Sequence, residues 1–433
     1  MKVSMQTFHT EYYLTGERKM KTLCIFTNEF PYGTWEPYLE TEINYYKDFE
    51  KVYIFSLQLR KEHSETKRKL PDNFKVIPIF YAPKWVYLVN SIFVLTDKNL
   101  YRELRELKKE KRLQLPRIID LFVYLSRSHY EMKKIKKAVN IANMENPIFY
   151  SYRFEYQPYV ALLLKKHLGK NIPVIARAHR FDLYENARRH DYLPLRRILL
   201  ENLTAVCPCS QDGSDYLTNN YPEFSEKIHP EFLGTVDHGV CAYNKDKIFS
   251  IVSCSTVISV KRLHLIVRAL EKIKDYDIKW THFGDGVLMD DIKNMTKKLP
   301  NNISTDFRGN IANEELLKFY SNEQFEILLN VSESEGIPVS IMEAMSFGIP
   351  CIATDVGGTK EIVTDKYNGI LLEKNFEPEI LAQWICKFIE MPSDEYMQYR
   401  KNARISWENK YNAEKNYEMF MKKLLRMGEQ YEV

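Results

Sequence analysis

The chain has 433 residues with a formal net charge of +4, and this length suffices for two domains that each bury a core. Its seven cysteines are scattered and form no CxxC pair, which argues against a disulfide framework or a zinc site and favours a reducing, cytoplasmic location. No run reaches the roughly 18 apolar residues needed to cross a bilayer, and no signal-peptide hydrophobic region begins the chain.

The first half alternates short apolar runs with helical stretches. Residues 1–20 are polar and unpatterned, and we treat them as an N-terminal extension without an assigned function. Alternation of this kind predicts a parallel, doubly wound sheet within a domain at residues 21–240. The expected strands are 23–27, 52–57, 76–81, 148–152, 174–178 and 205–209.

A loop with one glycine follows the first expected strand. It reads Asn-Glu-Phe-Pro-Tyr-Gly-Thr-Trp-Glu-Pro over residues 28–37, with Gly33 at its centre. A glycine in a strand-to-helix turn can bring backbone N–H groups close to a ligand. One glycine is also what an ordinary turn contains, so both interpretations stay open.

An apolar stretch at 85–95 precedes a basic cluster in the same domain. Such a combination suits an amphipathic surface that rests on anionic lipid headgroups. The alternative is the solvated face of ordinary helices, because Glu103, Glu106 and Glu110 are interleaved. No recognition motif supports nucleic-acid binding. The cluster comprises Lys98, Arg102, Arg105, Lys108, Lys109, Lys111, Arg112, Arg117, Lys133, Lys134, Lys136 and Lys137.

His179 and Asp182 come just after the expected strand 174–178. Ligands bind at the carboxyl ends of strands in open α/β sheets, which makes both residues candidates. A lone histidine is more often structural, so its function needs further support. Cys207 and Cys209 end another apolar run, and we interpret them as buried thiols rather than metal ligands.

A second series of strands predicts a second α/β domain at residues 241–410. Gly239 and polar neighbours within 235–247 interrupt both patterns, which places the link there. We expect helices at 396–410 and 413–426, the latter within a separate C-terminal segment, 411–433. The expected strands are 248–253, 278–283, 303–307, 325–331, 351–354 and 369–372.

Three turns of the second domain carry polar candidates. Lys261 and Arg262 follow its first strand and supply cations for an anionic ligand. Gly284 lies in the turn after the second strand, and Arg308 and Asn310 follow the third. Ordinary sheet turns would explain the last two segments equally well.

The segment 332–350, SESEGIPVSIMEAMSFGIP, lies between two buried strands and must contain the crossover helix. Pro338 suits the first helical position and Gly348 the stop, which predicts about ten helical residues. Gly336 allows close approach to the helix N-terminus, where N–H groups and the dipole favour an anion such as a diphosphate. Glu335 precedes the helix and Glu343 lies in its second turn, so both carboxylates can reach one ligand and bind sugar hydroxyls.

The segments EGIPVSIMEAMSFGIP, ATDVGGTKEIV and NGILL together resemble the signature of family 4 retaining glycosyltransferases. The resemblance extends from Thr22 to the last helix. It implies the B-type fold, two Rossmann-like domains facing a cleft, with a final helix that crosses back onto the N-terminal domain. The N-terminal domain would bind the acceptor and the C-terminal domain the nucleotide sugar.

The resemblance also implies residue roles. His179 matches the histidine at the sugar-transfer centre, and Lys261 matches a phosphate-binding lysine. The loop of Gly33 would lie over the donor phosphates and shape the acceptor site. One departure concerns an arginine a few residues before Lys261, where this chain has Cys254-Ser255-Thr256. Donor contacts are expected from Glu343, Arg262, Gly336, Ile337, Pro338, Val339, Ser340, Gly284, Arg308 and Asn310, with Asp182 on the acceptor side.

The implied reaction transfers a sugar from a UDP or GDP sugar to a hydroxyl of a glycan or lipid-linked acceptor, with retention. Lys261, Arg262 and the helix N-terminus at 337–340 would stabilise the leaving diphosphate, while Glu335 holds the sugar and Glu343 the ribose. No Asp-x-Asp pair follows a strand, so we expect no dedicated metal and no cofactor. We expect a role in surface polysaccharide synthesis, in the cytoplasm or peripherally at the inner membrane face. The alternatives are a non-catalytic glycosyltransferase-like partner subunit or chaperone and, with less support, a sugar-nucleotide epimerase.

Overall fold

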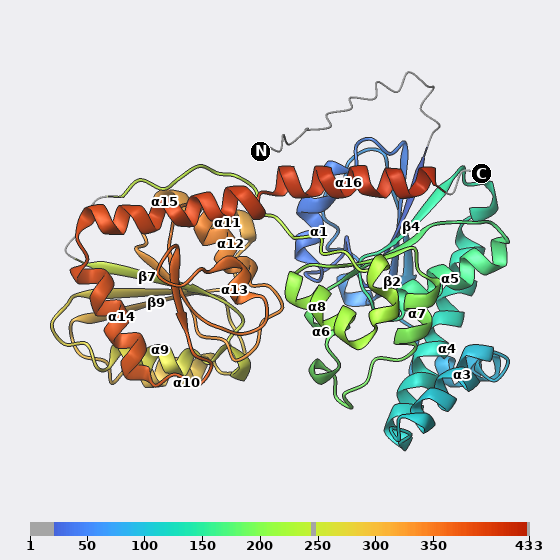
Figure 1. The fold of residues 1–433 in the computed structure, drawn as a ribbon, viewed down its shortest axis with the longest axis horizontal. Coiled ribbons are helices and arrows are strands. Elements are labelled where there is room, and N and C mark those ends of the chain that lie inside the picture. The colour runs from blue at the N-terminus through green and yellow to red at the C-terminus, as the bar shows by residue number, and fades with distance from the viewer. Residues whose placement is uncertain (1–20, 244–247, 431–433) are drawn as a thin grey trace, which may run out of the picture.

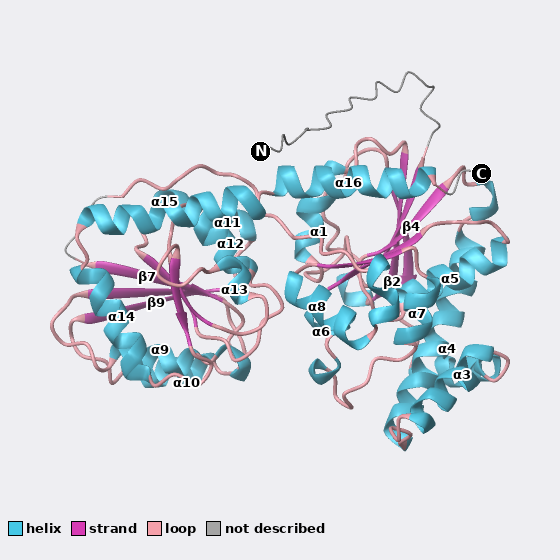
Figure 2. Ribbon diagram, viewed as in Figure 1, coloured by secondary structure: helices cyan, strands magenta, loops and turns pink. Residues whose placement is uncertain are grey.

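The computed structural model describes residues 21–243 and 248–430. The predicted extension at 1–20 and residues 244–247 of the predicted link lie outside the described residues. The chain forms two α/β domains side by side, and helix α16 (Ala413–Glu429) begins at their junction and lies along the first domain (Figure 1). Figure 2 shows helices on both sides of each sheet, the arrangement in which parallel strands are buried on both faces.

The first sheet has six parallel strands in the order β3-β2-β1-β4-β5-β6. Its strands are β1 (Thr22–Thr27), β2 (Lys51–Leu59), β3 (Phe74–Phe80), β4 (Pro147–Ser151), β5 (Val174–Ala178) and β6 (Ala205–Pro208). Its helices are α1 (Pro37–Glu42), α2 (Lys84–Val94), α3 (Lys98–Lys109), α4 (Leu115–Ala138), α5 (Gln157–Leu168), α6 (Arg180–Leu183), α7 (Arg196–Asn202) and α8 (Gln211–Asn220), with short 3-10 helices at Ile43–Tyr45, Lys61–His63, Ile141–Asn143, Glu185–Ala187 and Pro222–Lys227.

The second sheet is also parallel and six-stranded, in the order β12-β11-β10-β7-β8-β9. Its strands are β7 (Phe249–Cys254), β8 (Ile278–Phe283), β9 (Ile303–Gly309), β10 (Ile327–Asn330), β11 (Cys351–Thr354) and β12 (Gly369–Leu372). Its helices are α9 (Leu263–Leu270), α10 (Met289–Thr296), α11 (Asn313–Asn322), α12 (Val339–Ser346), α13 (Thr359–Ile362), α14 (Pro378–Glu390) and α15 (Ser393–Lys410), with a 3-10 turn at Ser259–Lys261.

The predicted fold class is confirmed, including the returning helix. Phe420 and Leu424 of α16 pack in the core beneath the first sheet, whereas Trp407 of α15 packs in the core of the second. The chain crosses between the domains twice, and the two crossings pair where Thr235 bridges Asn412. The exact domain limits at residues 240 and 410 stay predictions.

The crossover helix α12 differs in detail from the prediction. It has eight residues rather than about ten, because Pro338 adopts an extended conformation (ψ 101°) and caps the helix instead of beginning it. Gly348 ends the helix as predicted, with φ +76°, and the N–H of Ile349 returns to the carbonyl of Ala344. Glu343 remains in the second turn, as the spacing predicts.

The strand order defines where each sheet can bind a ligand. The order reverses between β1 and β4 in the first sheet and between β7 and β10 in the second. Loops diverge at such switch points and leave a crevice at the carboxyl ends of the strands. The loops of Gly33, Lys261 and Glu335 follow β1, β7 and β10, so they lie at these crevices.

Candidate functional site

Lys261 and Glu335 form an ion pair at the switch point of the second sheet. The ammonium nitrogen of Lys261 lies 2.6 Å from Oε1 of Glu335, and the two side chains are 23% and 10% exposed. The loops that carry them are joined where the N–H of Glu333 bonds the carbonyl of Val260 (2.8 Å). A partly buried cation is thus held beside the N-terminus of α12, where it can meet an anionic ligand.

Glu343 is nearly buried on α12, and burial raises the pKa of its carboxyl to about 7. Asn313, the first residue of α11, donates its side-chain amide to Oε1 (2.6 Å) and thereby opposes that shift. Cys254, whose thiol pKa burial raises to about 12, is close enough for Glu343 to contribute to the shift. Sequence reasoning missed Asn313, because no motif connects it with Glu343.

Gly336 packs against the N-terminal domain, and the expected close approach of a ligand to it stays a prediction. A side chain at this position would meet Cβ of Arg180 at 2.9 Å, and the Gly336 carbonyl accepts the N–H of Gly358 (2.8 Å). The absence of a side chain at Gly336 therefore lets the N-terminal domain pack against the loop between β10 and α12. Donor contacts by Ile337, Pro338, Val339 and Ser340 at the start of α12 stay predictions.

Arg262 is directed to backbone carbonyls rather than to a ligand. Its guanidinium donates to the carbonyls of Val331 (2.8 Å), Lys374 (2.7 Å) and Ser332 (3.2 Å). Arg262 itself has φ +50°, a left-handed conformation at the start of α9. Through these contacts Arg262 fixes the loop after β10 that presents Glu335, and its expected role in phosphate binding stays a prediction.

The turns after β8 and β9 are bound to each other. Gly284 (φ +129°) donates its N–H to the carbonyl of Gly309 (2.8 Å), and Asn310 accepts the N–H of Asp285 (3.1 Å). Arg308 pairs with Asp306 (2.7 Å) of its own strand. Donor binding by these residues stays a prediction, and for Arg308 this ion pair would have to exchange.

His179 lies at the carboxyl end of β5 with both ring nitrogens buried. Neither nitrogen has a hydrogen-bond partner within the described residues, and Nδ1 lies 3.8 Å from Asp182. Burial lowers the imidazole pKa, against the opposing effect of Asp182, so the ring is neutral at pH 7. Asp182 accepts the N–H groups of His179 (2.5 Å) and Phe154 (3.0 Å) and so fixes this loop. The ring can thus bond an incoming hydroxyl, while Asp182 acts on the backbone.

The loop of Gly33 is held together by Glu36, whose carboxylate bonds the backbone of the same loop. Glu36 is buried and accepts the N–H groups of Asn28 (3.0 Å), Glu29 (3.3 Å) and Phe30 (3.1 Å). Gly33 has φ +61° and donates its N–H to the hydroxyl of Thr66. These N–H groups already have partners within the protein, and the expected position of the loop over the donor phosphates stays a prediction. Shaping of the acceptor site by Gly33 stays a prediction.

The two domains touch directly beside these residues. Arg180, next to His179, donates through Nε (3.0 Å) and Nη2 (2.8 Å) to the hydroxyl of Ser334, next to Glu335. Glu361 on α13 accepts the first N–H groups of α8, from Gln211 (2.8 Å) and Asp212 (2.8 Å). These contacts bring the histidine loop and the Glu335 loop together across the interface.

Tyr38 on α1 was also missed. Its phenol pKa is raised by burial and by the carboxylates of Glu343 and Glu335, although 39% of the residue is exposed. The hydroxyl therefore lies near both carboxylates of the opposite domain. Exposed tyrosines are common on protein surfaces, so the sequence gives no signal for this one.

Neither a metal cluster nor a membrane span is found in the described part of the chain. No group of three or more His, Cys, Asp or Glu residues could hold a metal ion within residues 21–243 and 248–430. No helix in these ranges is long and apolar enough to cross a membrane. Independence from metals stays a prediction.

The signature region matches a known family. Residues 242–406 match the family model described as glycosyl transferases group 1. The C-terminal domain is therefore similar to group 1 glycosyl transferases over most of its length. The matched residues include Lys261, Glu335 and Glu343, so the family match covers this part of the candidate site.

Two curated relatives resemble part of the chain. An uncharacterized glycosyltransferase of Methanocaldococcus jannaschii is 39% identical over 121 residues, which cover 28% of this chain and 33% of that protein. An Escherichia coli UDP-Gal:alpha-D-GlcNAc-diphosphoundecaprenol alpha-1,3-galactosyltransferase is 29% identical over 140 residues, covering 30% and 33%. The match thus spans about a third of the length of these relatives.

The whole fold also has a solved counterpart. The structure of Anabaena HepE in complex with UDP-glucose superposes with a TM-score of 0.63 at 16% identity, covering 94% of this chain and 100% of that one. Identity at this level shows the fold alone. The C-terminal domain and the domain that precedes it therefore together form the B-type glycosyltransferase fold.

Proposed function

We propose that the protein is a retaining glycosyltransferase of family 4 that moves a sugar from a UDP or GDP sugar to a hydroxyl of a glycan or lipid-linked acceptor. The observation that carries this proposal is the Lys261–Glu335 pair at the N-terminus of α12 (2.6 Å). It supplies a cation for a departing diphosphate beside a carboxylate for sugar hydroxyls. The contact between Arg180 and Ser334 joins the loop of His179 to the loop of Glu335.

The chemistry divides between the two domains. When the donor binds, its diphosphate draws Lys261 away from Glu335, and Glu335 becomes an acceptor for sugar hydroxyls. As the bond between sugar and phosphate breaks, Lys261 and the N–H groups at the start of α12 stabilise the negative charge. The leaving phosphate accepts the proton of the attacking hydroxyl on the same face of the sugar, which gives retention. No metal and no cofactor are required in this scheme.

His179 positions the acceptor in this scheme. In either tautomer the neutral ring donates one hydrogen bond from one nitrogen and accepts one at the other. The ring lies beside Tyr152, with the two ring centroids 4.8 Å apart. The interdomain contacts exclude water, which otherwise hydrolyses the donor. Glu343 holds the ribose, with Asn313 fixing its orientation.

Transfer can be tested with purified protein and radiolabelled UDP and GDP sugars. We expect transfer or slow donor hydrolysis with one nucleotide, and a loss of at least a hundredfold in Glu335→Gln with folding retained. Glu373→Gln, an exposed glutamate of the same domain, serves as the matched control. Product with inverted anomeric configuration would refute the retaining mechanism, and equal activity of Glu335→Gln would refute the site.

The alternative is a non-catalytic partner subunit, favoured by Cys254 where the family has an arginine. Its thiol remains protonated at pH 7 because burial raises its pKa to about 12, so it supplies no charge to a phosphate. Nucleotide binding without hydrolysis or transfer, in the presence of glycan and lipid-linked acceptors, would favour this alternative.

We further propose that the protein works in surface polysaccharide synthesis, in the cytoplasm and peripherally at an anionic membrane. One surface of the N-terminal domain carries exposed apolar side chains at helical spacing. The E. coli relative acts on a diphosphoundecaprenol acceptor, a class that would require such a surface. The exposed side chains are Trp85, Val89 and Ile92 of α2 and Leu115, Ile119 and Val123 of α4.

Vesicle flotation tests the membrane contact. Trp85→Ser combined with Ile92→Ser should abolish flotation with anionic vesicles, because both side chains are about two-thirds exposed, at 66% and 67%. Val287→Ser combined with Met419→Ser removes equally exposed apolar groups elsewhere and should change nothing. Failure of the unmodified protein to float would refute the membrane contact but not the transferase.

A further inference from the structure

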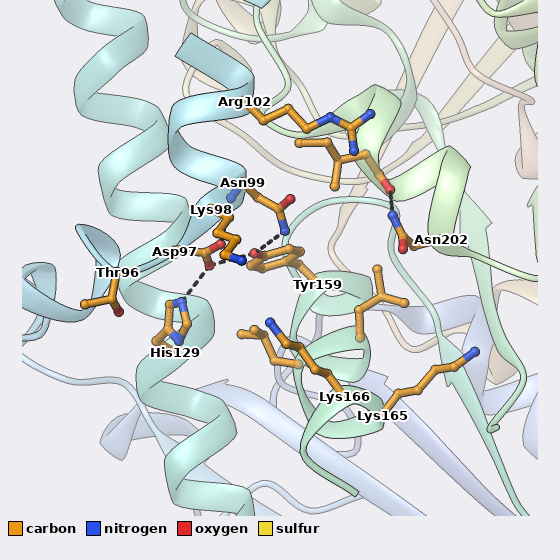
Figure 3. Close-up of a pocket in the computed structure, with 13 residues that line it drawn as sticks. Thr96, Asp97, Lys98, Asn99, Arg102, His129, Tyr159, Lys165, Lys166 and Asn202 are labelled. Carbon is orange, nitrogen blue, oxygen red and sulfur yellow. Dashed lines mark hydrogen bonds and ion pairs between the residues drawn. The ribbon is translucent and has the colours of Figure 1, made fainter. Parts of the chain in front are cut away.

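A cavity of about 630 Å³ lies in the N-terminal domain away from the candidate active site (Figure 3). Helices α3, α4, α5 and α7 form it. Its residues Lys165 and Lys166 lie in the last turn of α5, and Asn202 ends α7. These helices lead into the amino ends of β5 and β6, whereas His179 follows the carboxyl end of β5. The cavity and the cleft are thus at opposite edges of the sheet.

The cavity wall is strongly cationic. Lys98, Arg102, Lys165 and Lys166 line it, against the single carboxylate of Asp97. Figure 3 shows Lys98 and Lys166 approaching Tyr159 from two different helices. Lys165 is half-buried, and its pKa is lowered by burial and by Lys227 nearby. A bound anion would relieve this repulsion.

Asp97 does not cancel this charge, because its carboxylate is already satisfied. It accepts hydrogen bonds from His129 Nε2 (2.8 Å), the hydroxyl of Tyr159 (2.6 Å) and the N–H of Asn99 (3.0 Å). These bonds lower its pKa, and only 7% of its side chain is exposed. Asp97 also caps α3, whose N-terminus therefore opens onto the cavity. The residue builds the wall of the cavity rather than competing with a ligand.

We propose that this cavity binds a phosphate monoester. Arg102 is paired with Glu201, so Lys98 and Lys166 supply the positive charge for a ligand, and a dianion matches two cations better than a carboxylate does. Leu162, Leu163 and Ile198 form an apolar wall for the organic part of the ligand. The ester can be a lipid headgroup or a soluble metabolite, since both present the same phosphate.

Binding is measured by titrating inorganic phosphate at constant ionic strength into the Lys261→Ala protein, in which the candidate donor site has lost its lysine. We expect one saturable site. Lys98→Ala combined with Lys166→Ala should weaken it at least tenfold, because two of the cations are lost. Lys47→Ala combined with Lys75→Ala removes two exposed lysines of the same domain and should leave it unchanged. Absence of a saturable site, or equal weakening by both pairs, would overturn the proposal.

Vesicles distinguish the two sources of the phosphate. Phosphatidic acid presents a monoester and phosphatidylglycerol a diester. If the cavity pair reduces flotation with phosphatidic acid but not with phosphatidylglycerol, the ligand is a headgroup. If the variant with Lys98→Ala and Lys166→Ala no longer binds inorganic phosphate but floats like the control variant, the ligand is a soluble phosphate ester. Lys166→Ala alone, at an exposed position, repeats the titration if the double variant does not fold.

Discussion

The two sheets of the molecule have the same strand order but keep their charges in different places. Counted from its own first strand, each sheet runs 3-2-1-4-5-6. The first sheet buries Arg177 on β5 opposite Glu42 on α1, and neither is exposed. In the second sheet Trp280 holds the centre of β8, and the charges of the site follow the strand ends. One topology thus supports both a charged core and a charged rim.

The charged core fixes the histidine loop and the returning helix together. Arg177 donates to the hydroxyl of Tyr150 (2.9 Å), lies over the ring of Phe420 on α16 (4.4 Å) and approaches Glu42 (3.5 Å). His179 follows two residues later on the same backbone. The first domain therefore connects its functional loop to the C-terminal helix through buried groups, whereas the second presents its functional groups directly.

The largest effect should come from breaking the buried pair. Arg177→Met leaves Glu42 buried without its cation and should cost about 3–5 kcal/mol of unfolding free energy. Urea denaturation measures this loss. Glu42→Gln combined with Arg177→Met removes both charges and should recover much of it. A single-variant loss below about 1 kcal/mol would mean that the tyrosine hydroxyls alone satisfy Glu42.

The charged rim should be catalytic rather than structural. Lys261→Ala should lower kcat by on the order of 10²–10³, because it removes one group that stabilises the leaving diphosphate. The melting temperature should change little, since Lys261 is partly exposed. Lys374, a half-exposed lysine near Glu333 on the same rim, gives the control, and Lys374→Ala should retain full activity. A large loss of stability in Lys261→Ala would remove the distinction between core and rim.

Much of this comparison could be predicted from the sequence, because it depends on local patterns. Apolar runs located all twelve strands, and the spacing from Glu335 to Gly348 located the crossover helix. The sequence does not show which partner a polar group selects. Arg262 bonds backbone carbonyls of two other loops, after β10 and after β12. Glu36 bonds backbone N–H groups of its own loop. Their targets exist only after the loops have formed.

Contacts between domains are the least predictable from sequence. Gly336 suggested close approach of a ligand, and the close approach is real, but the neighbour is Arg180. A glycine shows that space is needed and not what occupies it. Asn313 became a candidate only through its hydrogen bond to Glu343, and Tyr38 only because Glu343 and Glu335 contribute to raising its pKa.

A smaller effect should come from the pH response of the second domain. In the free protein Glu343 is protonated below about pH 7, since burial raises its pKa to that value. Ribose hydroxyls bind its ionised form, so binding below pH 7 requires loss of a proton. Nucleotide affinity should therefore rise up to tenfold per pH unit toward pH 7 and level off above it.

Calorimetry in buffers of different ionisation enthalpy measures the released proton. Glu343→Gln cannot release it, so its affinity should be weaker above pH 7 and should lack this part of the pH dependence. Titration of the nucleotide phosphates remains in both proteins and cancels in the comparison. An identical pH profile for both proteins would place the ribose elsewhere than at Glu343.

The smallest effect should come from the contact that couples the two domains. Glu361 satisfies two N–H groups of α8 from the other domain, although Ser210 already caps that helix through Gly213 (3.0 Å). Glu361→Ala should therefore cost only about 1 kcal/mol, equivalent to about a fivefold shift toward separated domains. Donor affinity should fall by at most that factor, because only closed molecules keep the contact of Arg180 with Ser334 that joins the loops of His179 and Glu335. Glu361→Gln retains one acceptor and should lie between, and small-angle scattering should show the corresponding order of expansion. If donor affinity fell without any expansion, Glu361 would act on the nucleotide site within its own domain and not on the junction.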